Sequence, residues 1–399
     1  MSQLTPSGEV ISLGCRLNIA ESEAIRGFLA DAPPTVVVNS CAVTAEAVRQ
    51  SRRAVRRLRR AHPGARLVVT GCAATIDADA FAAMAEVDAV VSNSLKLRPE
   101  SWAANPARPP RAAGSHTRAF VPVQNGCDHA CTFCIIPQGR GASVSVPVPS
   151  VLEAIGQTVL AGERPVHEVV LTGVDVTSWG ADLPGAPKLG HLVQAILDAF
   201  PTLPRLRLSS LDGVEIDPLL FDLITQEPRV MPHIHLSLQS GSDMVLKRMK
   251  RRHSRRDAIA LVERMKARRP DIAIGADLIA GFPTETARMH AENLSIVSEC
   301  AVVHAHIFPY SPRPGTPAAR MPQVDPVLVR ERAAELRALA GRERTRWLET
   351  LVASPAQVLA ERDGTGHAPN FACYRVPVGT PAGNIVTVTP TRIVEGMLE

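Results

Sequence analysis

Short apolar runs alternate with amphipathic stretches over the first hundred residues of the chain. The apolar runs have the length of strands and lie at residues 10–13, 35–38, 67–70 and 87–91. Residues 17–29 have helical spacing, with Glu21 and Glu23 near the start, the end of a helix that favours negative charge. Apolar strands that alternate with helices predict a parallel α/β sheet. We therefore expect an N-terminal α/β domain over residues 1–98.

The same alternation resumes after residue 117 and continues to about residue 310. Strand patterns lie at residues 120–124, 166–171, 205–208, 233–238, 272–275 and 302–308. Helical patterns separate them at residues 150–161, 190–200, 217–226, 255–269 and 285–299. Six strand–helix steps predict an open (β/α)6 barrel over residues 117–350, with its active face at the carboxyl ends of the strands. The proline-rich residues 99–116 indicate a linker between the two domains.

The end of the chain has a different pattern. Residues 326–351 form a charged helical stretch, and residues 351–399 contain short strand patterns between glycine and proline turns. They predict a small C-terminal β domain, an architecture that often binds oligonucleotides. A domain of this size is near the lower limit for folding alone, so we expect it to pack on the barrel.

Composition narrows the class of protein. Of the 399 residues, 45% are hydrophobic and 21% are charged, which is typical of a globular protein. Residues 1–9 lack the pattern of a signal peptide, and no apolar run reaches the about 18 residues of a membrane span. We expect a cytoplasmic protein with no membrane partner. Eight cysteines are too few and too clustered for a disulfide scaffold, and a net charge of +5 mildly favours a polyanionic partner.

Three cysteines stand close together after the first predicted barrel strand. Cys127, Cys131 and Cys134 have C-x3-C-x2-C spacing, with Phe133 before the last cysteine. Four-iron clusters usually take four cysteine ligands, so three thiolates would leave one iron open to a small molecule. This spacing is the signature of the radical S-adenosylmethionine (SAM) superfamily, in which SAM binds the open iron. A zinc site with His129 as the fourth ligand, or three structural thiols, is the alternative.

Three further cysteines follow strands of the N-terminal domain. Cys15, Cys41 and Cys72 each lie one to three residues after a predicted strand. Because ligands bind at the carboxyl edge of a parallel sheet, this repeated placement predicts a second metal cluster there. The alternative is that each is a buried structural thiol, since free cysteines are commonly buried. We interpret Cys300 and Cys373, which stand alone, as structural.

Polar and glycine residues collect after the predicted barrel strands. Loop chemistry alone explains any one of them, but as a set at the strand ends of one barrel they indicate a ligand site. Gly173 in particular would let the backbone approach a ligand closely. The residues predicted to bind the SAM cofactor are Phe133, Gly173, Asp175, Ser209, Ser210, Gln239 and Asp277.

Two basic segments are candidates for RNA contact. The first is an arginine stripe on one face of a predicted helix, with Glu46 as the nearby acid in sequence; its members are Arg49, Arg52, Arg53, Arg56, Arg57 and Arg60. The second is a block at residues 247–256 that includes Lys250, Arg251 and Arg252. Arginine pairs bidentately with phosphate, although a solvated helix face has similar composition.

Taken together, these motifs resemble the tRNA methylthiotransferase family. The matching segments include LGCRLN at 13–18, NSCAVT at 39–44, TGCA at 70–73, GCDHACTFCIIPQGRG at 126–141, LTGVD at 171–175, LSLQSG at 236–241, GADLIAGFPTE at 275–285 and FPYSPRPGT at 308–316. The resemblance covers roughly residues 9–350. The chain departs from the family at Gln138, where tyrosine is more usual, and in a tail shorter than the usual TRAM domain.

The resemblance implies two [4Fe-4S] clusters, SAM and an anticodon-loop tRNA substrate. It implies a radical, generated from SAM at the Cys127/Cys131/Cys134 cluster, that removes the hydrogen from carbon 2 of N6-threonylcarbamoyladenosine. The Cys15/Cys41/Cys72 cluster would carry the sulfur, so no side chain is expected as catalytic acid or base. An electron donor and a sulfur donor are implied partners, and we expect a monomer. Sister branches act on isopentenyladenosine or a ribosomal protein aspartate, and a non-catalytic iron–sulfur or zinc RNA-binding module stays open.

Overall fold

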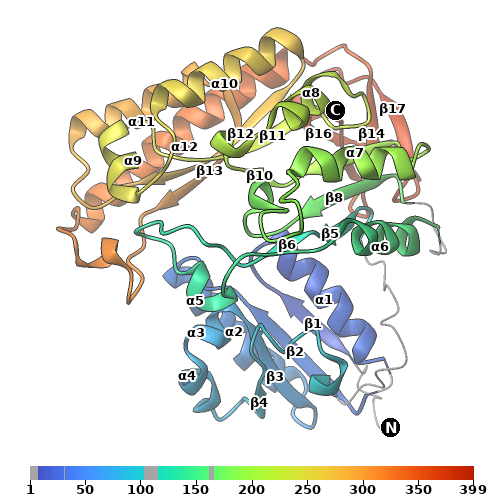
Figure 1. The fold of residues 1–399 in the computed structure, drawn as a ribbon, viewed down its shortest axis with the longest axis vertical. Coiled ribbons are helices and arrows are strands. Elements are labelled where there is room, and N and C mark those ends of the chain that lie inside the picture. The colour runs from blue at the N-terminus through green and yellow to red at the C-terminus, as the bar shows by residue number, and fades with distance from the viewer. Residues whose placement is uncertain (1–7, 31, 103–115, 161–165) are drawn as a thin grey trace.

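The computed structural model describes residues 8–30, 32–102, 116–160 and 166–399. Figure 1 shows a blue N-terminal sheet domain below, a larger barrel above it, and red C-terminal strands against one end of the barrel. The predicted α/β architecture with a small C-terminal β domain is confirmed. Residues 1–7 and most of the predicted linker, residues 103–115, lie outside the described ranges, and the domain boundaries stay predictions.

The N-terminal domain is a parallel sheet in the order β1-β2-β3-β4. Its elements are β1 (Glu9–Ser12), α1 (Arg16–Phe28), β2 (Thr35–Ser40), α2 (Ala45–Ala61), β3 (Arg66–Gly71), α3 (Cys72–Ile76), α4 (Ala78–Ala82) and β4 (Ala89–Val90). Along β2, Val36 and Val38 pack toward α2, whereas Val37 packs toward α1 and Trp102. Because both faces of β2 are covered, its sequence is a continuous apolar run. Trp102 ends a 3-10 turn (Pro99–Trp102), so the first residues of the predicted linker pack on this domain.

The barrel wall consists of parallel strands in chain order, in two sheets, β5-β8-β9 and β10-β11-β12-β13. The strands are β5 (Ala119–Pro122), β8 (Glu168–Thr172), β9 (Arg205–Leu208), β10 (Ser210–Leu211), β11 (His233–Gln239), β12 (Ala273–Ala280) and β13 (Val302–Pro309). Ser209 separates β9 from β10, and its N–H donates to the Leu171 carbonyl at 3.1 Å. The break therefore interrupts one strand, and the wall matches the six predicted steps.

Helices cover the outside of this wall (Figure 1). They are α6 (Val148–Leu160), α7 (Leu189–Ala199), α8 (Pro218–Gln226), α10 (Arg255–Arg268), α11 (Ala287–Glu299) and α12 (Pro326–Glu349). Shorter elements lie between them: β6 (Gln124–Asn125), α5 (Ile136–Arg140), β7 (Val144–Ser145), α9 (Asp243–Met249) and 3-10 turns at Val176–Ser178, Gly213–Glu215 and Pro317–Arg320. Helix α9 was not predicted, because its basic residues hide a short buried stripe of Val245, Leu246 and Met249.

The C-terminal domain is a sheet in the order β17-β14-β15-β16-β19-β18. Its strands are β14 (Ala356–Ala360), β15 (Thr365–His367), β16 (Cys373–Arg375), β17 (Ile385–Val388), β18 (Ile393–Val394) and β19 (Met397–Leu398). Tyr374 and Leu398 pack with Leu348 of α12 in one core, so the domain rests on the barrel as expected. Strands β15, β18 and β19, each of three residues or fewer, were not predicted. In the described ranges, no helix combines the length and apolarity that crossing a membrane requires.

Charged residues of the barrel, together with one aromatic ring of the C-terminal domain, close the amino-terminal end of the barrel. Glu168, fully buried, accepts hydrogen bonds from Arg118 and Arg207, each at 2.8 Å. The ring of Phe371 lies over this pair, 4.7 Å from the Arg207 guanidinium and stacked on His233 at 5.0 Å. Burial alone would raise the pKa of Glu168, but Arg207 and Arg118 lower it from 4.5 to about 2.

Glu168 is therefore expected to stabilise the fold in a pH-dependent way. Its folded pKa lies below the unfolded value, so its contribution is complete above about pH 4.5 and is lost as the pH falls toward 2. Glu168→Gln should cost about 3–5 kcal/mol at pH 7 by leaving buried arginines unpaired. That cost should shrink by about 2 kcal/mol at pH 3. Urea unfolding at both pH values measures it.

Glu331→Gln, at an exposed position of α12, is the matched control and should show no such dependence. A Glu168→Gln cost that is equal at pH 7 and pH 3 would contradict the ionised state of Glu168.

Candidate active site at two cysteine clusters

The loop that carries Cys127, Cys131 and Cys134 joins β6 to α5. It closes on itself at Gly126, which has a φ of +73° and where a Cβ would lie 1.8 Å from the Ala142 carbonyl oxygen. All three cysteines are free thiols. Burial raises the pKa of Cys127 to about 12 and that of Cys134 to about 11, and the neighbouring thiols of the loop add to both shifts. Three free thiols in one short loop form a donor set that fits an iron–sulfur cluster.

Arg251 lies directly beside this loop. Its Nη1 donates to Cys131 Sγ at 3.7 Å, and its Nη2 pairs with Asp212 at 2.9 Å. The Arg251 side chain is 7% exposed, so it does not belong to the RNA-facing surface on which the sequence placed it. Phe133 packs edge-to-face on Phe282 at 6.4 Å.

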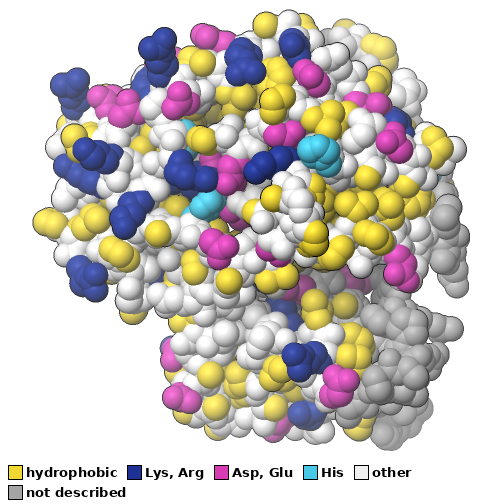
Figure 2. Space-filling model, viewed as in Figure 1, with side chains coloured by type: hydrophobic (Ala, Val, Ile, Leu, Met, Phe, Trp, Pro, Cys, Tyr) yellow, Lys and Arg dark blue, Asp and Glu magenta, His cyan; other side chains and the backbone are white. Residues whose placement is uncertain are grey.

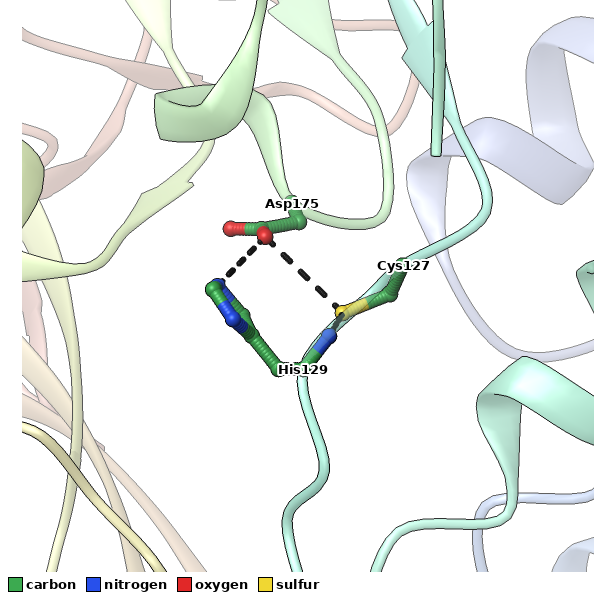
Figure 3. A group of neighbouring side chains, drawn as sticks. All are labelled: Cys127, His129 and Asp175. Atoms are coloured by element: carbon green, nitrogen blue, oxygen red, sulfur yellow. Dashed lines mark hydrogen bonds and ion pairs between the residues drawn. The ribbon is translucent and has the colours of Figure 1, made fainter. Parts of the chain in front are cut away.

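His129 is engaged with carboxylates in this structure. Figure 3 shows its ring and the Cys127 sulfur both pointing at Asp175, 2.7 Å from Nε2 and 3.8 Å from Sγ. The hydrogen bonds to Asp175 and Glu215 raise the pKa of His129 to about 10. His129 Nε2 also lies close enough to Cys127 Sγ and Asp175 for the three side chains to hold a metal ion together.

The N-terminal cysteines meet at the carboxyl edge of their sheet. Cys15 is exposed before α1, whereas Cys41 after β2 and Cys72 at the start of α3 are buried. Gly14 has a φ of +94°, and a Cβ there would lie 2.7 Å from Cys41 Sγ. Burial raises the pKa of Cys41 to about 11, and the thiols of Cys72 and Cys15 raise it further. The donor set of three neighbouring free thiols fits a second iron–sulfur cluster.

The two cysteine sets face each other across the domain boundary. Asn93 donates from Nδ2 both to Cys72 Sγ at 3.6 Å and to the Gly139 carbonyl at 2.5 Å. A Cβ at Gly139 would lie 3.3 Å from Cys72 Cβ, so the turn after the radical SAM loop packs directly on the N-terminal set. Cys72 is also among the neighbours that raise the pKa of Cys134. The N-terminal set therefore packs against α5, the helix that directly follows the other cysteine loop.

Comparison with known proteins agrees with this geometry. Residues 121–295 match the Radical SAM superfamily, and residues 8–92 match Uncharacterized protein family UPF0004. Threonylcarbamoyladenosine tRNA methylthiotransferase MtaB of Rickettsia prowazekii is 40% identical, over 98% of this chain and 96% of its own. The chain belongs to the tRNA methylthiotransferase family. A relative of the same name from Chlamydia pneumoniae is 35% identical, over 97% of this chain and 96% of its own.

A relative with another name is similar to this methylthiotransferase to almost the same degree. The tRNA-2-methylthio-N(6)-dimethylallyladenosine synthase of Novosphingobium aromaticivorans is 35% identical over 97% of both chains. Among solved structures, the radical SAM methyltransferase TsrM of Kitasatospora setae has a TM-score of 0.51 at 15% identity, covering 78% of this chain and 81% of its own, which shows a shared fold. The predicted family, the transferase class and the use of SAM with a [4Fe-4S] cluster are confirmed.

A buried polar network, which the sequence did not predict, joins the N-terminal domain of the methylthiotransferase to the barrel. Arg140 donates to both oxygens of Glu21, at 2.9 and 3.0 Å, to Asn18 at 2.5 Å and to Asn125 at 2.8 Å. Lys96 Nζ lies 2.6 Å from Glu21 Oε2, and all three charged side chains are at most 2% exposed. Burial alone would raise the pKa of Glu21, but Lys96 and Arg140 lower it. Glu21, which the sequence analysis noted only for its place near the start of a helix, is therefore a buried anchor.

Arg140→Met is expected to destabilise the chain by about 3–5 kcal/mol, because it removes one partner of a buried pair. Chemical denaturation followed by circular dichroism measures the change. Arg49→Met, which removes an exposed arginine paired with Glu46, is the control and should leave the midpoint unchanged. Equal stability of both variants would show that the Arg140 network does not hold the domains together.

Gly173, at the end of β8, packs against the side chain and backbone of Gln124. A Cβ at Gly173 would lie 2.7 Å from the Gln124 carbonyl oxygen, so this glycine makes room for Gln124. The Gln124 side-chain oxygen accepts from the N–H groups of Val174 and Asp175, at 3.1 and 2.8 Å. The loop after β8 is thereby fixed with Asp175 beside the cysteine loop.

Ser209, Ser210 and Gln239 end or begin strands on the same face of the barrel. The Ser209 hydroxyl is buried and has no hydrogen-bond partner among the described residues. Gln239 has a φ of +67°, a strained backbone for a residue other than glycine. Ser210 begins β10 at the break in the wall. An unpartnered hydroxyl and a strained strand end are both typical of a ligand site.

Asp277 lies inside the barrel between two histidines. It accepts from His235 Nε2 at 2.9 Å and from His306 Nδ1 at 3.0 Å, so neighbouring strands β11, β12 and β13 supply the three side chains. Burial would raise the pKa of Asp277, but the hydrogen bonds to His235 and His306 lower it to about 2. These donors would also suit a metal ion. Here they form a polar inner wall that the sequence did not predict.

The arginine stripe lies on α2 and is partly neutralised by acids distant in sequence. Glu46 pairs with Arg49 and Arg53, while Arg52 pairs with Asp77 and Arg56 with Glu86. In the described ranges, Arg57 and Arg60 form no ion pair, and both are exposed. Figure 2 shows further Lys and Arg side chains spread over the barrel in the upper part of its face, with Asp and Glu between them.

Proposed function

We propose that this enzyme adds a methylthio group to carbon 2 of N6-threonylcarbamoyladenosine next to the anticodon of tRNA. The relatives from Rickettsia prowazekii and Chlamydia pneumoniae, both threonylcarbamoyladenosine tRNA methylthiotransferases by name, support this substrate. The observation that carries the proposal is the meeting of two cysteine trios across the contact between Cys72 and Gly139. An ordinary radical SAM enzyme would need one trio.

The chain contains candidate binding residues for each cofactor. Cys127, Cys131 and Cys134 would hold the [4Fe-4S] cluster that binds SAM, and Cys15, Cys41 and Cys72 would hold a second [4Fe-4S] cluster. When bound, these cofactors supply the reducing electron, the radical that removes an unactivated hydrogen, and the sulfur that replaces it. For SAM we propose a site at the carboxyl ends of the strands, bounded by Phe133, Gly173, Asp175, Ser209, Ser210, Gln239 and Asp277.

The side chains hold and shield the reacting groups and transfer no proton. Gln124 and Gly173 fix the loop that carries Asp175, and Phe133 anchors the cysteine loop by packing on Phe282. Phe371 closes the far end of the barrel against water. We further propose that an electron donor and a sulfur donor serve the enzyme, that the chain is a monomer, and that it works in the cytoplasm.

For tRNA contact we propose the exposed arginines of α2, together with Lys250 and Arg252. The double variant Arg57→Gln/Arg60→Gln removes two arginines that have no ion pair in the described part of the chain. Binding of tRNA should weaken about 3- to 30-fold at low salt, and the slope of log Kd against log salt should fall by about 2. Filter binding at several salt concentrations measures both.

Arg49→Gln/Arg53→Gln is the matched control on the same helix. Both arginines pair with Glu46, so their loss should weaken tRNA binding less. Unchanged binding by the Arg57/Arg60 variant would remove α2 from the tRNA interface.

The test of the proposed function is a nucleoside digest. The reconstituted enzyme is incubated with SAM, dithionite and tRNA that carries either N6-threonylcarbamoyladenosine or N6-dimethylallyladenosine, and the digest is analysed by mass spectrometry. We expect a methylthio product from the first tRNA. A product from the second alone would assign the dimethylallyl branch, and no methylthio nucleoside from either would overturn the proposal.

A further inference from the structure

Arg16 extends from the N-terminal domain to the inside of the barrel. It directly follows Cys15, and its guanidinium lies 5.5 Å from the centroid of the Phe371 ring. The same ring lies 4.7 Å from Arg207 of the barrel wall and 5.7 Å from Arg118. Residues of all three domains therefore meet at one point, one residue away from a thiol of the N-terminal trio.

The charges at this point do not balance. Arg118 and Arg207 both donate to Glu168, and Arg118 also pairs with Glu361. Arg16 forms no hydrogen bond or ion pair with any residue of the described ranges, although it is half-buried. Its contact is the face of the Phe371 ring, which leaves the N–H donors of its guanidinium free for an anion. The arrangement therefore indicates an anionic ligand that is brought by the substrate.

The barrel interior above Arg16 is polar as well. His235, Asp277 and His306 line one wall, and the unpartnered hydroxyl of Ser209 lies on another. Ser209 is two residues beyond Arg207 along the strand, a rise of about 7 Å. A polar substituent on the substrate base could form hydrogen bonds with these side chains. An apolar dimethylallyl group would face the same polar side chains without hydrogen-bonding to them.

We propose that Arg16 binds the carboxylate of the N6-threonylcarbamoyl group and thereby selects this nucleoside. The inference rests on the proposed function and deepens it. A guanidinium pairs with a carboxylate through two parallel hydrogen bonds, so the contact fixes orientation as well as charge. Because Cys15 is the adjacent residue, holding the substituent at Arg16 also holds the base beside the N-terminal trio. Arg16 is a specificity-determining residue and takes no part in the chemistry.

Equilibrium binding tests this assignment in the holoprotein without reductant, so that no RNA is turned over. The probes are anticodon stem–loop RNAs that differ at one adenosine, which carries the threonylcarbamoyl group with a free carboxylate, or the same group as its amide. Wild type should bind the carboxylate form about 10- to 100-fold more tightly, as expected for a hydrogen-bonded charge pair. Arg16→Gln should bind both forms equally, and Arg16→Lys should keep part of the preference.

Arg288→Gln, at an exposed position 90% accessible on α11, is the control and should behave as wild type. A full carboxylate preference in Arg16→Gln would overturn the inference. Equal binding of both forms by wild type would also overturn it, while the nucleoside digest would still report on the proposed function. Absence of the threonylcarbamoyl product in that digest would instead overturn the proposed nucleoside.

Discussion

Replacing Cys131 with alanine is expected to abolish activity and to halve the iron content. Three thiolates leave one iron of a four-iron cube for SAM, and the loss of one thiolate leaves the cube held by Cys127 and Cys134 alone. Iron should fall from about eight to about four atoms per chain. Neither 5′-deoxyadenosine nor a methylthio nucleoside should form, a loss of the whole rate enhancement, typically more than about 10⁶-fold. Iron analysis and chromatography after reduction measure both.

The fold should survive this substitution. Arg251 keeps its ion pair with Asp212 at 2.9 Å when the Cys131 sulfur is removed, so no buried charge loses its carboxylate. Cys300→Ala is the control: this thiol is fully buried at the end of α11, and its loss should leave iron and activity as in wild type. Retention of about eight irons by the Cys131 variant would show that Cys131 does not hold a cluster.

Local sequence patterns predicted the elements that position the site. The buried run of β2 and the alternating strands and helices of the barrel depend on residues close in sequence, and both confirm the predicted architecture. The placement of Cys15, Cys41 and Cys72 after strands depends on the same patterns. Parallel topology then brings these strand ends to one edge, which is why spacing alone indicated a shared site.

The residues that sequence reasoning missed act through partners far away in the chain. Arg140 bonds to Glu21 across more than a hundred residues, and Arg251 bonds to Cys131 from a segment whose composition is that of a basic surface. Asp77 and Glu86 neutralise arginines of α2 in the same way. Pairing of this kind leaves no period in the sequence. A polar pair at helical spacing on the buried side of α1, Asn18 and Glu21, was the one available signal for the network.

The inside of the barrel illustrates the same limit. His235 and His306 alternate with apolar residues along their strands, a pattern that strand faces toward water share with faces toward a polar lumen. Gly275 on β12 pairs in register with His235, and a Cβ there would come 2.4 Å from the His235 ring. The close packing of a histidine on a glycine shows which face turns inward, and this contact exists only in the folded chain.

Replacing Cys15, Cys41 and Cys72 together with alanine is expected to separate two activities that Cys131→Ala removes at once. Iron should again fall from about eight to about four per chain. Because the radical SAM loop keeps its three thiols and the Arg140 network is intact, 5′-deoxyadenosine should still form from SAM under reduction. The methylthio nucleoside should not form, since no second cluster is left to supply sulfur. Cys373→Ala, in the C-terminal domain, should retain both products, and a methylthio nucleoside from the triple variant would show that the N-terminal trio is dispensable for sulfur insertion.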